Sequence, residues 1–501
     1  MDAGASAAGG HSGPRMDAAT LETHMSVLFF YGQHVLKVRK PVSYGFADFR
    51  DVERRRADCR REVQLNRRLS PDVYVGTARM IFQGRTAEHA VLMRRLPSTR
   101  SLASIVASGI DPLPELARVA DVLARFHSRA VRSPAISAST TPAAIWQRWQ
   151  ATEEALGRFV GTLVDARDYR RLVILAQRFL RGWGHLFLRR IASGAVCDGH
   201  GDLQAADVFC LPDGPRLLDC LEFDDTLRYG DVLADAAFLV QDLERVGAPG
   251  AARAFIEAYR RSSGTEQPEP LLHFYVAFRA HVRLLVECLR FEQDLGEPAD
   301  PPTVLAQALS HLEAAIPRLV LVGGLPGSGK STLASWVGEE LGAAVLSTDR
   351  VRTTKGTRSA GPLPFGTGRY TFRRRLGVYR QMLAEAEDLL RDASSVVLDA
   401  TWSSEAFRRL AMATARSTAA TVVELECRTG PDERTRRILG RGRSGESDAT
   451  LAIAEALAAT SDPWPTAHVV DTSRSVDEAG RGVLEVLHAG TPAHDAPGAT
   501  P

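Results

Sequence analysis

The chain has 501 residues, more than one compact hydrophobic core usually holds, so we expect two or three domains. Its 62 basic and 60 acidic residues nearly balance, which excludes a general electrostatic attraction to nucleic acids or anionic membranes. No two of the six cysteines form a C-x-x-C pair, and no apolar run approaches the ~20 residues of a membrane helix. We therefore expect a cytoplasmic protein with reduced thiols and no membrane partner.

A small strand-rich lobe is predicted at residues 21–97, after an Ala/Gly/Ser-rich stretch, residues 1–20, that lacks a signal peptide's apolar core and is predicted to be disordered. The segments MSVLFFY and HVLKVRK predict two strands joined at Gly32-Gln33, and RMIFQG and HAVLMRRLP predict another pair around Gly84. Between the two pairs, apolar residues from Phe49 to Leu69 recur at helical spacing.

A larger, mainly helical lobe is predicted at residues 98–312, so that both lobes form one α+β domain, residues 21–312. Its exception is a strand pair, DVFCL and RLLDCLEF, turned at Pro212-Asp213-Gly214. Helices are predicted at residues 231–245, 251–261 and 273–295, and a last one before residue 315.

From Arg318 onward the pattern changes to alternating strands and helices. The strand-like segments are RLVLVGG, AAVLST, SSVVLDAT, ATVVELEC and AHVVDTS. Such alternation predicts an α/β domain, residues 316–489, with a parallel sheet and crossover helices. The Pro/Ala-rich tail, residues 490–501, is predicted to be disordered.

The segment GLPGSGKS, residues 324–331, matches G-x-x-x-x-G-K-[ST] between a predicted strand and a predicted helix, the context that this motif requires. In that reading the loop N–H groups surround phosphate oxygens, Lys330 reaches the β and γ phosphates of ATP, and Ser331 binds Mg²⁺. The alternative is a Gly-rich turn. The predicted nucleotide-binding residues are Gly324, Pro326, Gly327, Ser328, Gly329, Lys330, Ser331 and Thr332.

Two aspartates follow predicted strands of this sheet and should lie near the phosphates, because ligands bind at the carboxyl ends of parallel strands. Asp349, in LSTDRVR, could accept the proton of a substrate hydroxyl, and Arg352 could hold an acid or phosphate group. Asp399, in VVLDAT, could hold hydrated magnesium. Either aspartate could instead be a helix N-cap.

The segment ERTRRILGRGR places Arg434, Arg437 and Arg441 at helical spacing. Arg437 and Arg441 could close over the transferring phosphoryl group as a lid, and a solvated basic helix face is the alternative. Together with the P-loop and the two aspartates, this segment resembles the small P-loop kinases, over about residues 318–488. That group includes gluconate kinases, polynucleotide 5′-kinases, chloramphenicol phosphotransferases and zeta-type toxins. The resemblance implies phosphorylation of a hydroxyl by ATP, with Asp349 as the base.

The segment HGDLQAAD, residues 200–207, resembles the catalytic loop H-G-D-x-x-x-x-N of aminoglycoside phosphotransferases, and the resemblance extends over residues 21–312. It implies that Asp202 orients the acceptor hydroxyl and that Asp219 binds magnesium. It also implies that Lys37 pairs with the α and β phosphates and that Glu62 is the partner of Lys37.

The sequence departs from that family at Asp207, which replaces the Asn that binds a second magnesium, and at Gln204, where relatives often have His. A carboxylate at residue 207 attracts metal but repels nucleotide phosphates. An active kinase, an inactive nucleotide-binding domain and a structural acidic hairpin therefore all stay open. Asp231 and Asp235, at i and i+4, could accept N–H groups of the catalytic loop, or could simply begin a helix.

The tandem order resembles a family of large bacterial two-domain proteins in which an aminoglycoside-phosphotransferase-like domain is fused to an ATP-binding domain. We expect an ATP- and Mg²⁺-dependent phosphotransferase that acts on a hydroxyl of a small molecule. The alternatives are a regulatory ATP-binding protein with a degenerate first domain, and a nucleic-acid-end kinase, although no nucleic-acid partner is expected from the charge balance. The acceptor and the oligomeric state stay open.

Overall fold

A computed structural model describes residues 19–23, 25–44, 47–82, 85–293, 300–354, 371–440 and 450–489. It divides into two compact units. The first unit contains residues 1–145 and 189–267, and the second contains residues 146–188 and 268–501. The domain boundaries predicted at residues 312 and 316 stay a prediction. Of the two predicted disordered ends, residues 1–18 and 490–501 lie outside the described residues, whereas Thr20 already begins a strand.

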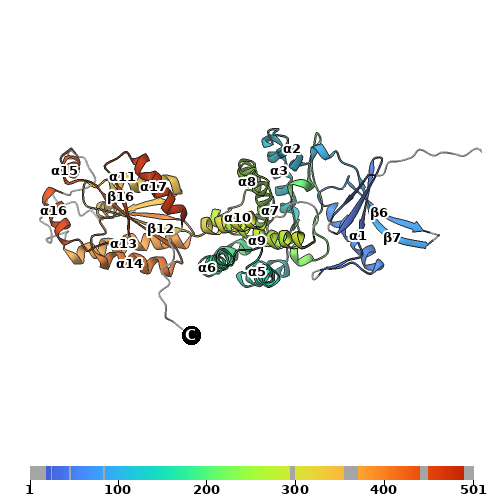
Figure 1. Cartoon of the computed structure of the whole chain (residues 1–501), viewed down its shortest axis with the longest axis horizontal. Helices are drawn as coiled ribbons and strands as arrows, with labels where there is room; N and C mark the ends of the chain where they lie inside the picture. Colours follow the sequence, from blue (N-terminus) through green and yellow to red (C-terminus); the bar gives the residue numbers. More distant parts are fainter. Residues whose placement is uncertain are drawn as a thin grey trace, which may run out of the picture. The chain divides into compact units, whose positions relative to one another are not determined.

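The first unit begins with an antiparallel sheet in the order β1-β2-β3-β7-β6 (Figure 1). Its strands are β1 (Thr20–Glu22), β2 (Ser26–Tyr31), β3 (His34–Arg39), β6 (Tyr74–Phe82) and β7 (Arg85–Arg94), and β4 (Ser43–Tyr44) pairs with β5 (Ala47–Asp48). Helix α1 (Val52–Asn66) begins after Asp51, whose carboxylate accepts the N–H groups of Glu53 and Arg54, and the helix packs on β6 and β7. The predicted strand-rich lobe is thereby confirmed.

The rest of the first unit is mainly helical, with two short antiparallel strand pairs. The strand pairs are β8 (Val196–Asp198) with β11 (Tyr229–Asp231), and β9 (Val208–Leu211) with β10 (Gly214–Leu217). The helices are α2 (Leu102–Ala107), α3 (Leu113–Arg129), α4 (Pro134–Ala138), α7 (Val232–Arg245) and α8 (Pro249–Ser263), with 3₁₀ turns at Ser98–Arg100, Ala205–Asp207 and Asp225–Leu227. The predicted strand RLLDCLEF is too long, because Asp219 has a φ of 62°, a left-handed value that ends extended pairing.

Helices before the P-loop belong to the second unit as well. They are most of α5 (Pro142–Leu156), most of α6 (Ala166–Ala192), α9 (Glu269–Gln293) and α10 (Pro301–Ala315). Their shared core contains Trp149, whose ring stacks on His281 with 4.2 Å between the ring centroids. Burial lowers the pKa of His281 to about 3, so this ring stays neutral in the core and accepts or donates one hydrogen bond with Tyr169.

The parallel sheet of the second unit has the order β13-β14-β12-β15-β16. Its strands are β12 (Arg318–Gly323), β13 (Ala344–Ser347), β14 (Val396–Asp399), β15 (Thr421–Arg428) and β16 (His468–Asp471). The helices after residue 318 are α11 (Lys330–Leu341), α12 (Thr348–Thr354), α13 (Phe372–Arg391), α14 (Glu405–Ser417), α15 (Pro431–Gly440), α16 (Leu451–Thr460) and α17 (Val476–Ala489). The predicted α/β alternation is confirmed.

Alternate residues of the central strand β12 explain why helices cover both faces of this sheet. Leu319 and Leu321 pack into a core with α13 and α14, whereas Val320 and Val322 pack into a core with α11 and α17. Figure 1 shows these two helix layers on opposite sides of β12. The carboxyl ends of β12, β13 and β14 consequently meet at one edge, where ligands bind in such sheets.

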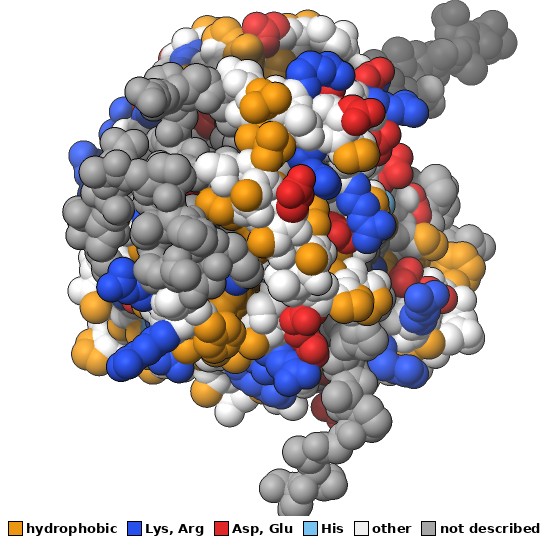
Figure 2. Space-filling view, turned by 90° about the vertical axis from the view of Figure 1, so that its left-hand side faces the viewer, with side chains coloured by type: hydrophobic (Ala, Val, Ile, Leu, Met, Phe, Trp, Pro, Cys, Tyr) orange, Lys and Arg blue, Asp and Glu red, His pale blue; other side chains and the backbone are white. Residues whose placement is uncertain are grey.

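Three expectations from the sequence concern membrane helices, cysteines and surface charge. No helix among the described residues is long and apolar enough to cross a bilayer. All six cysteines are buried and free. On the face that Figure 2 shows, the described basic and acidic side chains are interspersed rather than gathered by sign.

Candidate functional site

The loop between β12 and α11 is shaped by glycines in conformations that other residues avoid. Gly324, Gly327 and Gly329 have φ values of 141°, 81° and 84°. A Cβ on Gly324 would lie 2.5 Å from Ser328 Oγ and 2.7 Å from the Cys427 carbonyl oxygen, so a side chain there is excluded by space as well as by conformation. The loop is therefore a backbone cradle of the kind that admits phosphate oxygens.

The charged residues of this cradle come from the start of α11 and from the end of β14. Lys330 begins α11 and is only 8% exposed, and Asp399, at the end of β14, is equally buried. Ser331 and Thr332 follow on the exposed side of α11. The Thr472 hydroxyl donates to the Ser328 carbonyl oxygen, which fixes the cradle to the end of β16. A buried lysine at the N-terminus of a helix, directly after a glycine-rich loop, favours a polyanion.

The predicted base lies at the same sheet edge. Ser347, the last residue of β13, pairs with Asp399 in the parallel register, and Asp349 follows two residues later in the first turn of α12. Arg352 Nη1 donates to Asp349 Oδ1 over 2.7 Å, and both side chains are 28% exposed. The Asp349 carboxylate is thus oriented by a guanidinium group that solvent can also reach.

Arg375 was not among the site residues predicted from the sequence. Arg375 is half-buried, donates to Ser403 Oγ over 2.8 Å and lies over the ring of Phe407. Burial and the charge of Arg352 lower its pKa, although Tyr379 acts in the opposite direction. Its spacing of four residues from the buried Tyr379 on α13 was the available signal.

Helix α15 lies against the cradle. Arg437 donates to the Thr472 carbonyl oxygen over 2.8 Å and to Glu433 over 2.7 Å, and a Cβ on Gly329 would lie 3.1 Å from Arg437 Nη1. Arg437 is therefore beside the P-loop, and its role there stays a prediction. Arg441 lies outside the described residues.

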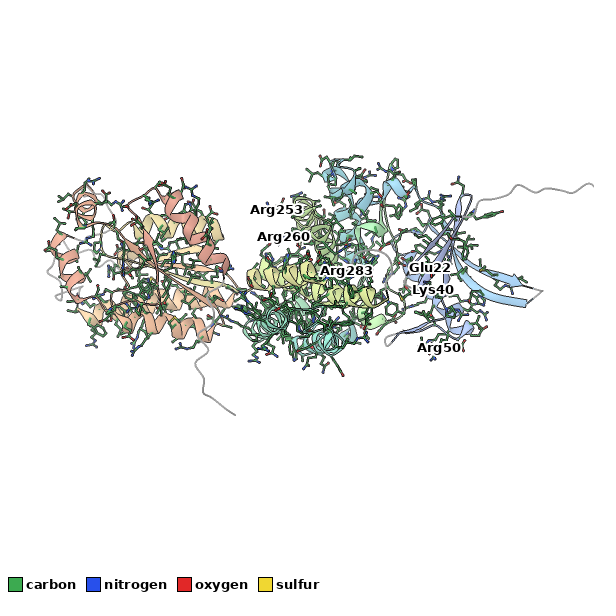
Figure 3. All side chains as sticks on the ribbon, in the orientation of Figure 1. Glu22, Lys40, Arg50, Arg253, Arg260 and Arg283 are labelled. Carbon is green, nitrogen blue, oxygen red and sulfur yellow. The ribbon has the colours of Figure 1, made fainter. Side chains whose placement is uncertain are left out.

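A second candidate site lies in the first unit, where Lys37, Glu62 and Asp219 come together from β3, α1 and the segment after β10. Lys37 Nζ lies 3.0 Å from Glu62 Oε1 and also forms an ion pair with Asp219. Burial alone would lower the pKa of Lys37, but Asp219 and Glu62 raise it, so the ammonium stays charged. The neighbouring Lys40 pairs instead with Glu22 of β1, 2.6 Å away and visible in Figure 3.

The pKa values of two carboxyl groups in this site, Asp219 and Asp207, are shifted in opposite directions. Burial by itself raises the pKa of Asp219, but the charge and the hydrogen bond of Lys37 bring it below the usual value. Desolvation and the carboxylates of Asp219 and Asp202 raise the pKa of Asp207 well above its usual value. In the metal-free protein, Asp207 consequently keeps a proton to higher pH than Asp219 does.

Helix α7 holds the segment of residues 200–207, the predicted catalytic loop, in place. Asp235 accepts the N–H groups of His200 and Gly201 over 2.6 and 2.8 Å, as the sequence analysis proposed as one alternative. Asp242, about two turns farther along the helix, accepts the N–H of Ala205 over 2.8 Å and was not predicted. Gln204 donates to Asp202 Oδ2 over 3.0 Å, so the residue that replaces a common His orients the acidic side chain beside it.

The described residues contain no group of three or more His, Cys, Asp or Glu side chains placed to bind a metal. Magnesium often takes only one or two protein carboxylates and completes its shell with water and nucleotide phosphates. The P-loop residues fit magnesium bound together with nucleotide phosphates. The glycine cradle and the buried Lys330 suit a polyphosphate, and Asp399 and Ser331 offer oxygen atoms beside it.

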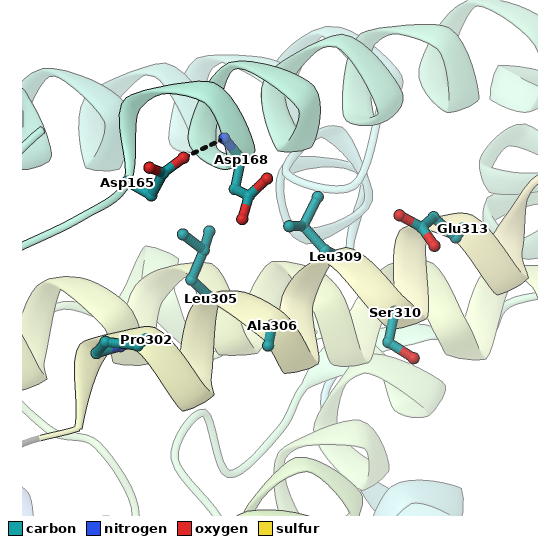
Figure 4. A pocket seen from close by; sticks show the side chains of 8 residues that line it. All are labelled: Asp165, Asp168, Pro302, Leu305, Ala306, Leu309, Ser310 and Glu313. Carbon is teal, nitrogen blue, oxygen red and sulfur yellow. Dashed lines mark hydrogen bonds between the residues drawn. The ribbon is translucent and has the colours of Figure 1, made fainter. Parts of the chain in front are cut away.

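A pocket of about 310 Å³ lies elsewhere in the second unit, between α6 and α10 (Figure 4). Leu305, Leu309 and Ala306 line it together with the carboxylates of Asp165, Asp168 and Glu313. None of the predicted site residues lines this pocket, so it is separate from both candidate sites.

Comparisons with known proteins give one family model and several relatives that are similar to this chain. Residues 319–463 match the family model described as AAA domain. The chain is 41% identical over 467 residues to the "Uncharacterized protein Rv2004c" of Mycobacterium tuberculosis (strain H37Rv), covering 91% of this chain and 94% of that protein. The "Uncharacterized protein Mb2027c" of Mycobacterium bovis gives the same identity and coverage.

Two solved structures are also similar. The GDP and kanamycin complex of APH(2")-IIia is 18% identical and covers 60% of this chain and 94% of its own, with a TM-score of 0.39. The Mycobacterium tuberculosis APS kinase CysC in complex with AMPPNP and APS is 23% identical and covers 34% of this chain and 98% of its own, with a TM-score of 0.27. At such TM-scores these two likenesses carry no argument.

The mycobacterial relatives do support an argument about the family, since they match 91% of this chain at 41% identity. The chain belongs to the same family as these mycobacterial proteins, and its residues 319–463 match the AAA domain model.

Proposed function

We propose that the protein is an ATP- and magnesium-dependent phosphotransferase whose P-loop domain transfers the γ-phosphate of ATP to a hydroxyl of a small molecule. One observation carries the proposal: a glycine cradle that no side chain can fill surrounds the start of α11, where Lys330 is buried. A buried ammonium group loses most of its hydration, and a bound polyphosphate compensates its charge. The first unit binds a second nucleotide through Lys37, with Asp219 and Asp207 toward its metal.

In the P-loop domain, phosphoryl transfer needs positioning and charge more than covalent chemistry. Lys330 and the loop amides hold the β and γ phosphates, and Ser331 and Asp399 hold magnesium, which neutralises part of the phosphate charge when it is bound. The acceptor oxygen forms the new P–O bond as the bond to the β-phosphate oxygen breaks and ADP leaves. The hydroxyl proton passes to Asp349, which Arg352 orients.

The acceptor is proposed to carry an acid group near its reacting hydroxyl. Arg352 on α12 and Arg375 on α13 are charged side chains on two helices that pack together beside Asp349. Arginine suits planar, bidentate binding of carboxylates and phosphates. The near balance of 62 basic and 60 acidic residues favours a small acid over a nucleic acid.

The first test measures ATP turnover by the full chain with a panel of hydroxylated acids and sugars. Lys330→Ala should lower acceptor-dependent turnover about a hundredfold or more, because the transferring phosphate loses its counter-charge. Arg391→Ala is the matched control, since Arg391 is exposed on α13 and pairs only with Glu387 in the described contacts. Normal turnover in a Lys330→Ala/Asp202→Ala double variant would defeat the proposal.

The acceptor class has its own test. Arg375→Ala should raise KM for an acidic acceptor about tenfold and leave KM for ATP unchanged, because it removes one contact to the acid group. Arg374→Ala is the control, as Arg374 is the exposed neighbour on the same helix. Equal effects of the two substitutions would contradict an acidic acceptor.

A regulatory role of the first unit is the second candidate, and Asp207 is the observation that favours it. Its carboxylate adds a negative charge beside Asp219 and Asp202, where aminoglycoside phosphotransferases have Asn, so it repels nucleotide phosphates as well as attracting metal. If Asp207→Asn brings phosphotransfer by a Lys330→Ala chain up from nothing, the first unit was degenerate. If the Lys330→Ala chain already transfers phosphate, the regulatory role is excluded.

A further inference from the structure

Glu62 has two cationic partners, only one of which belongs to the predicted site. Its Oε1 lies 3.0 Å from Lys37 Nζ, and its Oε2 accepts a hydrogen bond from Arg39 Nη2 over 3.1 Å. Lys37 and Arg39 are two residues apart on β3, so their side chains leave the same face of the sheet. Glu62 is 1% exposed and Arg39 4%, which means that water compensates neither charge.

Arg39 also binds the segment that carries Asp219. The same Nη2 forms an ion pair with Glu222, which is 183 residues away in the sequence and three residues after Asp219. The guanidinium lies over the ring of the buried Phe49, with its Cζ 5.1 Å from the ring centroid. Charges therefore alternate along one continuous chain: Asp219, Lys37, Glu62, Arg39 and Glu222.

The backbone of the same segment is anchored independently of Arg39. The N–H of Asp219 donates to the Tyr74 hydroxyl over 3.0 Å, and the N–H of Cys220 donates to Asn66 Oδ1 over 2.8 Å. The N–H of Leu221 donates to the His200 carbonyl oxygen over 3.1 Å. The backbone thus has its own contacts, and Arg39 contributes the side-chain contact that joins Glu222 to Glu62.

We propose that Arg39 is a positioning residue for nucleotide binding by the first unit. This inference rests on the proposed function, because it takes Lys37 to bind phosphates and Asp219 to face the metal. When a nucleotide engages Lys37, Glu62 and Asp219 share that ammonium with the phosphates. Arg39 then supplies the charge that keeps Glu62 and Glu222 in place, so Lys37 approaches the nucleotide from a fixed position.

The alternation of charge makes the effect of each substitution predictable. Without Arg39, Glu62 and Glu222 are buried carboxylates with no cation between them, and Glu62 draws Lys37 away from the phosphates more strongly. A lysine at residue 39 keeps the charge but lacks the forked geometry that joins two carboxylates. Removing the acid of Glu222 together with Arg39 restores the balance between charges around Glu62.

The experiment measures binding of the magnesium complex of the β,γ-imido analogue of ATP to the full chain with Lys330→Ala, by calorimetry. In that background, Arg39→Met should weaken binding about tenfold or more, Arg39→Lys should weaken it less, and Arg39→Met/Glu222→Gln should recover part of the loss. Lys40→Met is the matched control, because Lys40 directly follows the same strand but pairs with the exposed Glu22 (both labelled in Figure 3), and it should change affinity less than about twofold.

A second readout separates positioning from folding. Thermal unfolding of each variant is recorded without nucleotide, and Arg39→Lys is used where Arg39→Met lowers the melting temperature of the first unit. An affinity equal to that of the Lys40→Met variant overturns the inference. A Lys330→Ala chain that binds no nucleotide also overturns it, but leaves the P-loop proposal intact, since that proposal is tested by binding and turnover of the chain with Lys330 present.

Discussion

Asp235 shows how a single buried carboxylate can organise the backbone of a loop, here the predicted catalytic loop at residues 200–207. It accepts two consecutive loop N–H groups, from His200 and Gly201, and forms a third hydrogen bond with His127 Nε2 over 3.0 Å. The His127 ring also bonds the Tyr259 hydroxyl, which explains its burial in the core. Burial alone would raise the pKa of Asp235, but His127 and the loop N–H groups hold it at about 2.

The pKa of Asp235 predicts the pH range in which it stabilises the first unit. Its folded value of about 2 lies below the usual 3.8, a difference that corresponds to about 2 kcal/mol. A depressed carboxyl pKa stabilises the folded chain fully above about pH 4, and the stabilisation is lost as the pH falls toward 2. Asp235→Asn should therefore lower the free energy of unfolding by about 2 kcal/mol at pH 7, and less below pH 4, when urea unfolding is compared with the wild type.

The control for this prediction is Asp213→Asn, because Asp213 is an exposed turn residue that pairs with Arg216. Its substitution should change stability little at either pH, as exposed ion pairs contribute about 0–1 kcal/mol. A constant difference between wild type and Asp235→Asn across the whole pH range would mean that the carboxylate's charge is not what stabilises the loop.

Residue roles with a local signature were open to prediction, and those set by distant contacts were not. Asp349 and Arg352 are three residues apart on one helical turn, so their contact follows from local spacing, although the sequence analysis assigned Arg352 only to an acid or phosphate group. Arg39 and Glu222 meet across 183 residues, and nothing in VLKVRK or CLEF indicates that pairing. Asp242 looked like any helix-surface acid, because the N–H that it accepts belongs to Ala205 in another segment.

At the scale of elements, the apolar periods predicted most strands and helices, and their ends depended on single residues. The strand after Pro212-Asp213-Gly214 ends at Leu217 because the backbone of Asp219 is left-handed. That conformation turns the Asp219 side chain out of the strand pattern and toward Lys37. A sequence of apolar residues on both sides of an Asp does not reveal such a turn.

Helix α6 contains an element-scale feature that the sequence did not indicate. Arg178 donates to the carbonyl oxygen of Ala419 over 2.7 Å, and Trp183 Nε1 donates to that of Leu390 over 2.8 Å. Trp183 has non-helical dihedral angles, so the helix is kinked where this indole enters the second unit's core. A side chain on Gly182 would lie 2.7 Å from Ala419 Cβ, which leaves only glycine there.

We expect Arg178→Met to destabilise the second unit by about 2 kcal/mol, since the Ala419 and Ala420 carbonyl groups would lose their charged donor. Arg181→Met is the matched control, because Arg181 is exposed one turn farther along α6. Urea unfolding of both variants measures the difference. Equal stability of the two would show that α6 does not contribute to the P-loop domain through Arg178.

At the scale of the whole molecule, the change from a mixed pattern to strand–helix alternation at Arg318 predicted two kinds of fold in one chain, and the structure has both. The P-loop was predictable because its glycines and lysine are consecutive. The composition of the second unit was not, since residues 146–188 join it through contacts such as Arg178 to Ala419, 241 residues apart. No period or motif in the sequence records contacts at that distance.

Two compact units with separate cores and separate proposed nucleotide sites predict two unfolding transitions that respond separately to ligand. A ligand at about 100 times its Kd stabilises the unit that binds it by about 2.7 kcal/mol. In differential scanning calorimetry of the full chain, the magnesium complex of the β,γ-imido analogue of ATP should raise both transitions. Lys330→Ala should abolish only the shift of the second unit, and Lys37→Met only that of the first.

The Lys40→Met chain, which keeps both proposed sites, should show both shifts and so controls for the loss of a lysine in the first lobe. If only one transition of the wild type responds to the analogue, the chain has one nucleotide site, and the substitution that removes the shift identifies it. If Lys330→Ala removes both shifts, the units bind nucleotide in dependence on each other, because loss of one site then lowers the affinity of the other by their coupling free energy.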